Sequence, residues 1–292
     1  MKIKLSHRNS IEQVLPLRDG IQKVRRALRA RLSLLRSNLP RAERTAHLRT
    51  EFFRLRVALA ILLSVAASVA ASDLPVRPLA SKGALVFSDD FARAELGAAW
   101  QSGTPTFTVS DGVLKGRQTR AEHGAVAGAT LPLRDGNVIL ELKFRFEGAK
   151  SIHVACDDKT FKGVHAGHIS RIVIFPNKIT VYDDKEGIMR NDIYALRKST
   201  DPKDKAESQR LATGRSQSFP LTLDAKRWYR FGLEIVGDQL RATIDDRPVA
   251  YLKSSGLTHS KKDDLRLQVW GMEGDGLIDD LRVWAVAPTS VK

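Results

Sequence analysis

Residues 136–147 read GNVILELKFRFE, and this stretch decides the fold class. From position 140 onward, apolar and charged side chains alternate strictly. Successive side chains of a strand point to opposite faces of a sheet, so the pattern predicts a strand with one face in a core and the other toward solvent or ligand. The core face comprises Val138, Leu140, Leu142, Phe144 and Phe146.

The same period of two recurs in short segments from residue 84 toward the C-terminus, with turn residues between them. Asp111-Gly112 predicts a two-residue hairpin within 106–118. Other predicted strands are 151–156, 169–175, 179–182, 228–236, 240–244, 249–252, 265–270 and 277–286. Helical periodicity is scarce, which disfavours a parallel α/β fold because that fold needs helices between its strands. We therefore predict an all-β domain over residues 84–288, an antiparallel two-sheet sandwich of jelly-roll type.

One polar segment, 189–220, interrupts this pattern. A helix is predicted locally over 202–211, with Thr200 or Asp201 as its cap. Connections of this length in compact domains are usually functional or disordered, so two interpretations stay open: a lid over a site, or a peripheral decoration.

The N-terminal part carries a short apolar run, 57–71, that reads VALAILLSVAASVAA. Arg54 and Arg56 precede it, and small residues at its end suit cleavage near Ala71 or Ser72. The run is shorter than the roughly 18 to 20 residues of a membrane-spanning helix. It predicts a signal peptide or an uncleaved anchor helix over 57–72, followed by a linker over 73–83, whereas a buried core helix is the structural alternative. A secreted or periplasmic location follows, with membrane contact only through 57–72.

Most of the formal charge of +15 lies in a basic leader, residues 1–56, which hold 15 Lys and Arg against four acidic residues. The rest of the chain is only about +4, which does not suit a nucleic-acid platform. A leader of this length is unusual before a signal peptide. One hypothesis is that translation starts downstream of Met1, at a non-ATG codon now read as Leu48, Leu55 or Val57. The alternative is a basic cytoplasmic segment before an anchor.

Composition excludes several other classes. Cys156 is the only cysteine, so neither an intrachain disulfide nor a cysteine-rich zinc module is possible. The sequence also lacks a nucleotide-binding glycine loop, a nucleophile elbow and a zinc-protease helix.

The order of dispersed motifs carries a resemblance to a known family. They are FSDDF at 87–91, Trp100, FTVSDGVL at 107–114, Gly124, the strand at 137–146, RWY at 227–229, the hairpin at 238–246 and IDDLRVW at 278–284. This order resembles the concanavalin A-like lectin/glucanase superfamily and is similar to its secreted 3-keto-disaccharide hydrolase-type domain, over residues 84–286. The resemblance implies a jelly-roll fold and hydrolysis of a glycoside or 3-keto-glycoside in a concave-face cleft.

Two family features are missing from this chain. The Glu-x-Asp-x-(x)-Glu strand of laminarinase-like enzymes, which aims two catalytic carboxylates at one cleft, does not occur here. The central Gly-Tyr-Glu-Val-Gln-type segment of the 3-keto-disaccharide hydrolase-type domain is replaced by HVACDDKTFKGVHAGHISRI at 153–172. The alternative function is therefore a non-catalytic carbohydrate-binding module or a structural module of the cell envelope.

That replaced segment is also the densest cluster of reactive side chains. Asp157 and Asp158 are candidate catalytic acids or bases, and His165 and His168 are candidate proton shuttles. Lys159 and Arg171 are candidates for binding sugar hydroxyls or an oxyanion. The competing interpretation is an ordinary charged loop between strands.

Further substrate-binding candidates lie on predicted strands. Arg266, Gln268 and Trp270 alternate onto one face of a late strand, where an indole stacks on a pyranose and the polar groups bond its hydroxyls. Glu141 lies on the charged face of the strand at 137–146, which is either a sugar-binding face or simply a solvated one. Trp228 and Trp284 are expected in the core.

A calcium site is a separate hypothesis. Terminal strands of a jelly roll often pair, which would gather Asp89, Asp90, Asp279 and Asp280 around Ca²⁺, an ion that takes six to eight oxygen ligands. The competing interpretation is that these carboxylates cap turns. No other cofactor is expected, and the expected partner is a carbohydrate.

We expect the exported protein to begin near Ala71 or Ser72, because small residues there suit signal peptidase. Mass spectrometry of the native product measures this. A mature N-terminus upstream of Val57 would contradict the downstream start of translation.

Overall fold

The computed structural model describes residues 74–102, 106–133 and 135–288. The basic leader predicted at 1–56 and the signal or anchor helix predicted at 57–72 lie outside these residues. Within the described ranges, no helix combines the length and the apolar character needed to cross a membrane.

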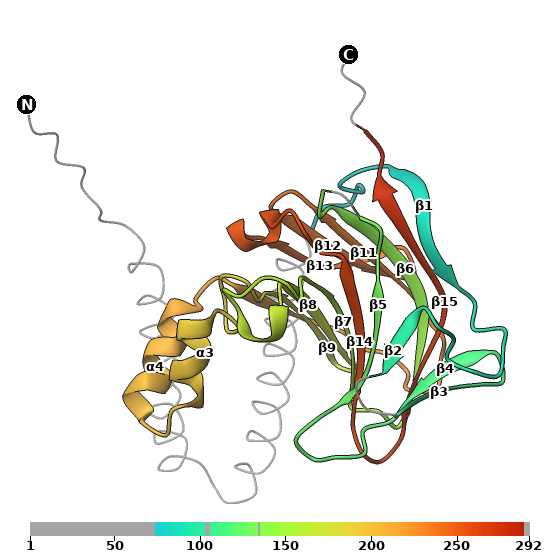
Figure 1. The fold of residues 1–292 in the computed structure, drawn as a ribbon, viewed down its shortest axis with the longest axis horizontal. Helices are drawn as coiled ribbons and strands as arrows, with labels where there is room; N and C mark the ends of the chain where they lie inside the picture. The colour runs from blue at the N-terminus through green and yellow to red at the C-terminus, as the bar shows by residue number, and fades with distance from the viewer. Residues whose placement is uncertain (1–73, 103–105, 134, 289–292) are drawn as a thin grey trace, which may run out of the picture. The chain divides into compact units, whose positions relative to one another are not determined.

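Two antiparallel sheets make up the described domain (Figure 1). In spatial order, the first sheet contains β13 (Arg247–Lys253), β12 (Gln239–Ile244), β11 (Tyr229–Val236), β6 (Val138–Glu147), β15 (Asp275–Val286), β4 (Val113–Gly116) and β3 (Phe107–Ser110), and β1 (Lys82–Asp89) also pairs with β15. The second contains β10 (Ser216–Pro220), β9 (Lys178–Asp183), β8 (Ser170–Phe175), β7 (Ser151–Asp157), β14 (Asp264–Trp270), β5 (Ala125–Thr130) and β2 (Trp100–Ser102). The predicted all-β sandwich of two antiparallel sheets is confirmed.

The inner faces of both sheets share one hydrophobic core. In β6 the five predicted apolar residues are all buried, while the charged residues between them are only partly buried. The Phe144 ring packs edge-on against Phe146 and is stacked on Tyr229 of β11, with both pairs of ring centroids 5.6 Å apart. Strand β6 therefore joins the middle of the first sheet to the core.

Several local predictions are confirmed. The β3–β4 hairpin turns at Asp111 and Gly112, which both have positive φ, as a tight two-residue turn requires. Helix α4 (Pro202–Leu211) has the predicted bounds, and the Asp201 side chain accepts a hydrogen bond from the Lys203 amide at 2.8 Å.

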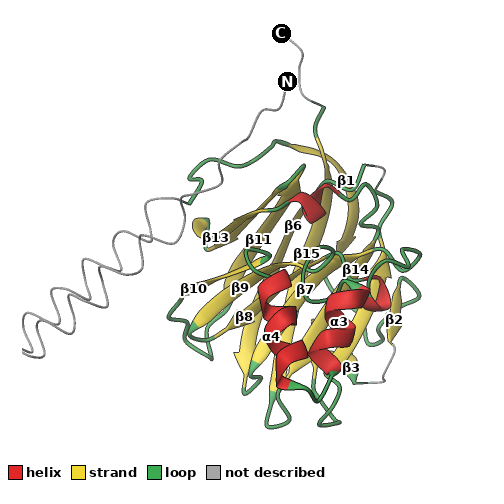
Figure 2. Ribbon diagram, turned by 90° about the vertical axis from the view of Figure 1, so that its left-hand side faces the viewer, coloured by secondary structure: helices red, strands yellow, loops and turns green. Residues whose placement is uncertain are grey.

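Other features differ from the sequence prediction. Helix α3 (Asn191–Lys198) and strand β10 were not predicted within 189–220. Both helices lie on the outer side of the second sheet (Figure 2). Trp228 and Trp284 are wrong as core residues: both are half-buried, with Arg145 over the first indole and Lys82 over the second, because a cation covers these rings instead of the opposite sheet.

Replacing Phe144 with alanine tests whether the core is centred on β6. We expect Phe144→Ala to lower the free energy of unfolding by about 3 to 5 kcal/mol, because it removes a fully buried ring and leaves a cavity. Urea unfolding followed by tryptophan fluorescence measures the change. The matched control is Leu85→Ala, whose side chain is 52% exposed and whose loss is expected to matter by about 0.5 kcal/mol or less. Equal effects of the two variants would contradict a core centred on β6.

Candidate functional site

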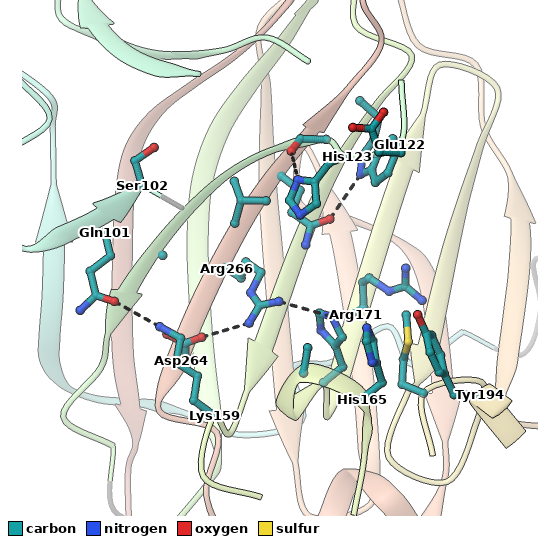
Figure 3. Close-up of a pocket in the computed structure, with 18 of the residues that line it drawn as sticks. Gln101, Ser102, Glu122, His123, Lys159, His165, Arg171, Tyr194, Asp264 and Arg266 are labelled. Atoms are coloured by element: carbon teal, nitrogen blue, oxygen red, sulfur yellow. Dashed lines mark hydrogen bonds and ion pairs between the residues drawn. The ribbon is translucent and has the colours of Figure 1, made fainter. Parts of the chain in front are cut away.

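A pocket of about 650 Å³ lies on the outer face of the second sheet (Figure 3). Its walls come from β2, β5, β8 and β14, from the loop between β7 and β8, and from helix α3. Segments distant in sequence therefore meet over one face of one sheet.

The floor of the pocket follows from strand register. One cross-strand row runs from Gln101 of β2 through Gly128, Arg266 and Ala155 to Arg171 of β8. The small residues Gly128 and Ala155 flank Arg266 on its two sides, so the row is hollow around the guanidinium group. The alternating partners Leu265, Leu267 and Val269 of β14 are buried in the core.

The loop between β7 and β8 brings two histidines to this floor. It contains a short 3-10 turn, η1 (His165–Gly167), with positive φ at Ala166 and Gly167. A β-carbon on Gly167 would collide with the carbonyl oxygen of Asp158, so the close approach requires glycine. The turn sets His165 at its start and His168 directly after its end, and both side chains line the pocket.

His168 is the middle of a buried polar chain. Its Nδ1 lies 3.0 Å from Asp157 Oδ2, and its Nε2 lies 3.3 Å from Nη1 of Arg266. Arginine only donates hydrogen bonds, so in this arrangement Nε2 accepts and Nδ1 donates to the carboxylate. Asp157 also accepts from the Ile169 amide and lies 3.4 Å from Arg266 Nε. The imidazole is thus held with its accepting nitrogen on the Arg266 side.

Asp264 is a buried carboxyl group on the same face. Its Oδ1 lies 2.6 Å from Lys159 Nζ, and its Oδ2 lies 3.6 Å from Arg266 Nη2. Burial raises the pKa of Asp264 above its ordinary value, although Lys159 and Arg266 act in the opposite direction. The Asp264 carboxyl group is therefore held between a lysine and an arginine in the wall of the pocket.

Helix α3 forms one wall. The Tyr194 ring is stacked on the His165 imidazole, with ring centroids 3.9 Å apart and planes 8° apart. Arg197 follows one turn further along α3, and its guanidinium carbon lies over the Tyr194 ring, 5.0 Å from the ring centroid. Burial lowers the pKa of His165, and the charges of Arg197, Lys198 and Arg266 lower it further. Three basic side chains therefore surround this imidazole.

The far end of β14 carries Trp270, which is half-buried. Its ring is stacked on His153 of β7, with centroids 6.1 Å apart, and its indole nitrogen donates to Gln268 at 3.3 Å. A β-carbon on Gly124 would lie 2.7 Å from the indole, so the Gly124 backbone also contacts this ring. Burial, together with the charge of Arg171, lowers the pKa of His153 from 6.5 to about 3.

Most of the predicted site residues come together. Seven line the pocket: Lys159, His165, His168, Arg171, Arg266, Gln268 and Trp270. Asp157 is fully buried behind His168 and reaches the pocket only through that side chain.

Two predicted site residues lie elsewhere. Asp158 points away from the pocket to His259 Nε2, at 3.0 Å, because consecutive side chains at the end of a strand diverge. Although burial opposes it, hydrogen bonds from Thr160 and His259 hold the pKa of Asp158 well below its ordinary value. Glu141 is on the first sheet, where it pairs with Lys82 at 2.6 Å. Neither side chain therefore lines this pocket.

The predicted calcium donors do not fit an ion. Strands β1 and β15 do pair, as expected. However, both oxygens of Asp89 bind Arg93, at 2.6 and 2.7 Å, and Asp280 pairs with Lys143 at 2.5 Å. Among the described residues, no group of three or more His, Cys, Asp or Glu side chains is placed to hold a metal. Of the four predicted calcium donors, Asp89 and Asp280 are thus engaged by basic side chains, whereas Asp90 and Asp279 accept hydrogen bonds from the backbone amides of Ala92 and Asp280.

Several lining residues were missed from sequence. Asp264 shares the alternation of Arg266, Gln268 and Trp270, so the same pattern contained it. Gln101, Glu122, His123, Tyr194 and Arg197 also line the pocket, but only the folded arrangement brings them there.

Three solved structures illustrate what the fold is similar to. The carbohydrate-binding module CBM66 from Bacillus subtilis is 12% identical, with 65% of this chain and 98% of that chain covered and a TM-score of 0.42. The laminarinase from Rhodothermus marinus is 13% identical, with 72% and 100% covered and a TM-score of 0.48. The endo-β-galactosidase from Clostridium perfringens that releases GlcNAcα1-4Gal is 11% identical, with 73% and 65% covered and a TM-score of 0.45. No protein-family model and no curated protein matches the sequence.

The neutral, buried His153 predicts acid sensitivity. Its pKa is lower in the folded protein than in the unfolded chain, so its contribution is complete above pH 6.5 and is lost as the pH falls toward about 3. In this window we expect wild-type stability to fall more steeply than that of His153→Gln, by up to about 1.4 kcal/mol per pH unit. Urea unfolding of both proteins at pH 7, 5.5 and 4.5 measures the difference. Parallel pH profiles would contradict the assignment.

Proposed function

We propose that this protein is a carbohydrate-active enzyme that binds a sugar in the pocket over β14 and cleaves it. The observation that carries the proposal is the chain from Asp157 through His168 to Arg266, which sets an oriented imidazole beside a cation in a hollow. Around it, Gln101 and Gln268 offer amide groups that suit sugar hydroxyls. The export predicted from residues 57–72 would place this activity outside the cytoplasm.

The carboxyl groups of the pocket suit an ordinary glycosidase less well. Hydrolysis of an ordinary glycoside uses two carboxyl groups that face the bond from its two sides. Of the two carboxylic side chains that line the described pocket, Asp264 already pairs with Lys159, and Glu122 is exposed. One oriented base among cations is a better match to chemistry that starts with removal of a proton.

A 3-keto-glycoside allows such chemistry. Its C2 proton is acidic because the neighbouring C3 carbonyl stabilises the resulting enolate. In the proposed reaction, Arg266 moves its hydrogen bond from Nε2 of His168 to the C3 carbonyl oxygen, which frees this nitrogen to take the C2 proton. Asp157 then stabilises the imidazolium, and Arg266 stabilises the enolate oxygen. The enolate then expels the aglycone from C1, which leaves with the bond's electron pair and takes up a proton from water. The resulting hydroxide adds to C1 of the C1=C2 double bond, and His168 returns its proton to C2, which gives the free keto sugar and restores the neutral imidazole.

A second candidate is sugar binding without catalysis. The observation that favours it is that both buried carboxylates are already engaged, Asp157 with His168 and Asp264 with Lys159. Such fully paired groups are typical of a rigid recognition surface.

Replacing His168 separates the two candidates. We expect the protein to release sugar from 3-keto-glycosides, and His168→Ala to reduce this rate about 100- to 10,000-fold because the base is lost. Mass spectrometry of the released sugars follows the reaction across glycosides and their 3-keto derivatives. The matched control is His259→Ala, which removes the imidazole of the other Asp–His pair, outside the pocket, and is expected to retain turnover.

Calorimetry with the same sugars measures binding and so distinguishes a binding protein from an enzyme. Binding without turnover by the wild-type protein would support the non-catalytic candidate. Neither binding nor turnover by the folded protein would overturn both candidates.

A further inference from the structure

We infer that the sugar bound in this pocket is acidic, and that Arg197 of α3 binds its carboxylate or sulfate group. The inference rests on the proposed carbohydrate function and adds the class of ligand. It starts from the charges that line the pocket.

Three of the four Lys and Arg side chains that line the pocket have carboxylate partners. Arg171 forms two hydrogen bonds with Asp184, at 2.9 and 3.0 Å. Lys159 pairs with Asp264, and Arg266 lies between Asp157 and Asp264. Their charges are balanced within the protein.

Arg197 is the fourth, and in the described part of the chain no carboxylate lies within ion-pairing distance of it. Its Nη2 lies 3.9 Å from the sulfur of Met189, a weak acceptor. Its Nε is buried and has no hydrogen-bond partner among the described residues. The guanidinium group lines the pocket with only a weak acceptor beside it, so a ligand that supplies an anionic acceptor there would be bound preferentially.

The surroundings of Arg197 agree with this assignment. His165 next to it has its pKa lowered by burial and by the charges of Arg197, Lys198 and Arg266, which agrees with a positive potential at this wall. The pocket's unpaired carboxylate, Glu122, is exposed and comes from the segment before β5. An anion is therefore favoured on the α3 side.

The aromatic rings of the pocket leave little room for a neutral sugar to stack. Tyr194 is stacked on His165 and has Arg197 and Lys198 over its ring. Trp270 is stacked on His153 and contacts Gly124. Because each ring already has a stacked partner within the protein, we expect polar and charged contacts to supply much of the ligand's binding energy.

The position of Arg197 is fixed before a ligand arrives. Helix α3 is tied to the η1 loop by the Asn191 amide, which donates to the Gly163 carbonyl at 3.2 Å, and by a bridge between Val164 and Arg190. The stack of Tyr194 on His165 adds a side-chain contact. A guanidinium group held in this way loses little freedom when it binds an anion.

Calorimetry with matched oligosaccharides tests the inference. The probes are a neutral glucose oligomer, its uronic-acid counterpart and its sulfated counterpart, each with the full-length protein. We expect the acidic probes to bind at least about tenfold more tightly than the neutral one. Arg197→Ala should remove this preference, and Arg197→Lys should restore part of it. A carboxylate and a sulfate ester differ in geometry, so the tighter acidic probe identifies the group that is recognised.

The control is Arg210→Ala on α4, which changes the net charge equally but removes an arginine paired with Glu207 outside the pocket. It should keep the preference. Equal binding of neutral and acidic probes, or a preference unchanged in Arg197→Ala, would overturn the inference and leave the carbohydrate function standing. Binding of none of the three would overturn the proposed function itself.

Discussion

The alternation of side chains along β14 fixes which residues face the core and which face the pocket. Leu265, Leu267 and Val269 enter the sandwich core, so the residues between them must face outward. A slip of one residue would exchange these two sets and place leucines in the pocket. Because the core residues cannot leave the core without a large loss of stability, the site geometry is as rigid as the sandwich behind it.

The electrostatics of the pocket depend on this rigid support. Asp157 and Asp184 are fully buried, and each stabilises a cationic or polar group that faces the hollow. Charges in such positions are costly to desolvate, and they persist only when well paired. The adjacent residues Asp157 and Asp158 have different partners because the backbone points their side chains in different directions. Asp157 orients His168 in the pocket, and Asp158 binds His259 outside it.

The sequence predicts the sandwich well, because alternation in β6 and the turn at Asp111 are local properties of the chain. The row on β14 and the link from Asp157 to His168 follow from the same alternation and from a short loop. Glu141 was misplaced because alternation identifies a face of a strand but not the sheet to which that strand belongs. Helix α3 was missed because it has a single fully buried residue, Ile193, so it carries no strong apolar period. A count of acids likewise does not reveal that Asp89 and Asp280 pair with an arginine and a lysine.

The residues that line the pocket come from two parts of the chain, the sandwich itself and the helical segment 191–211. Strands and the η1 loop carry His168 and Arg266, whereas Tyr194 and Arg197 come from α3, a segment outside both sheets. Changes at Arg197 can therefore alter which ligands are accepted while the strands that carry Arg266 and the core stay the same. With this arrangement, ligand specificity can change during evolution while the sandwich stays the same. Helix α3 is also the segment to exchange when the pocket is redesigned for another sugar.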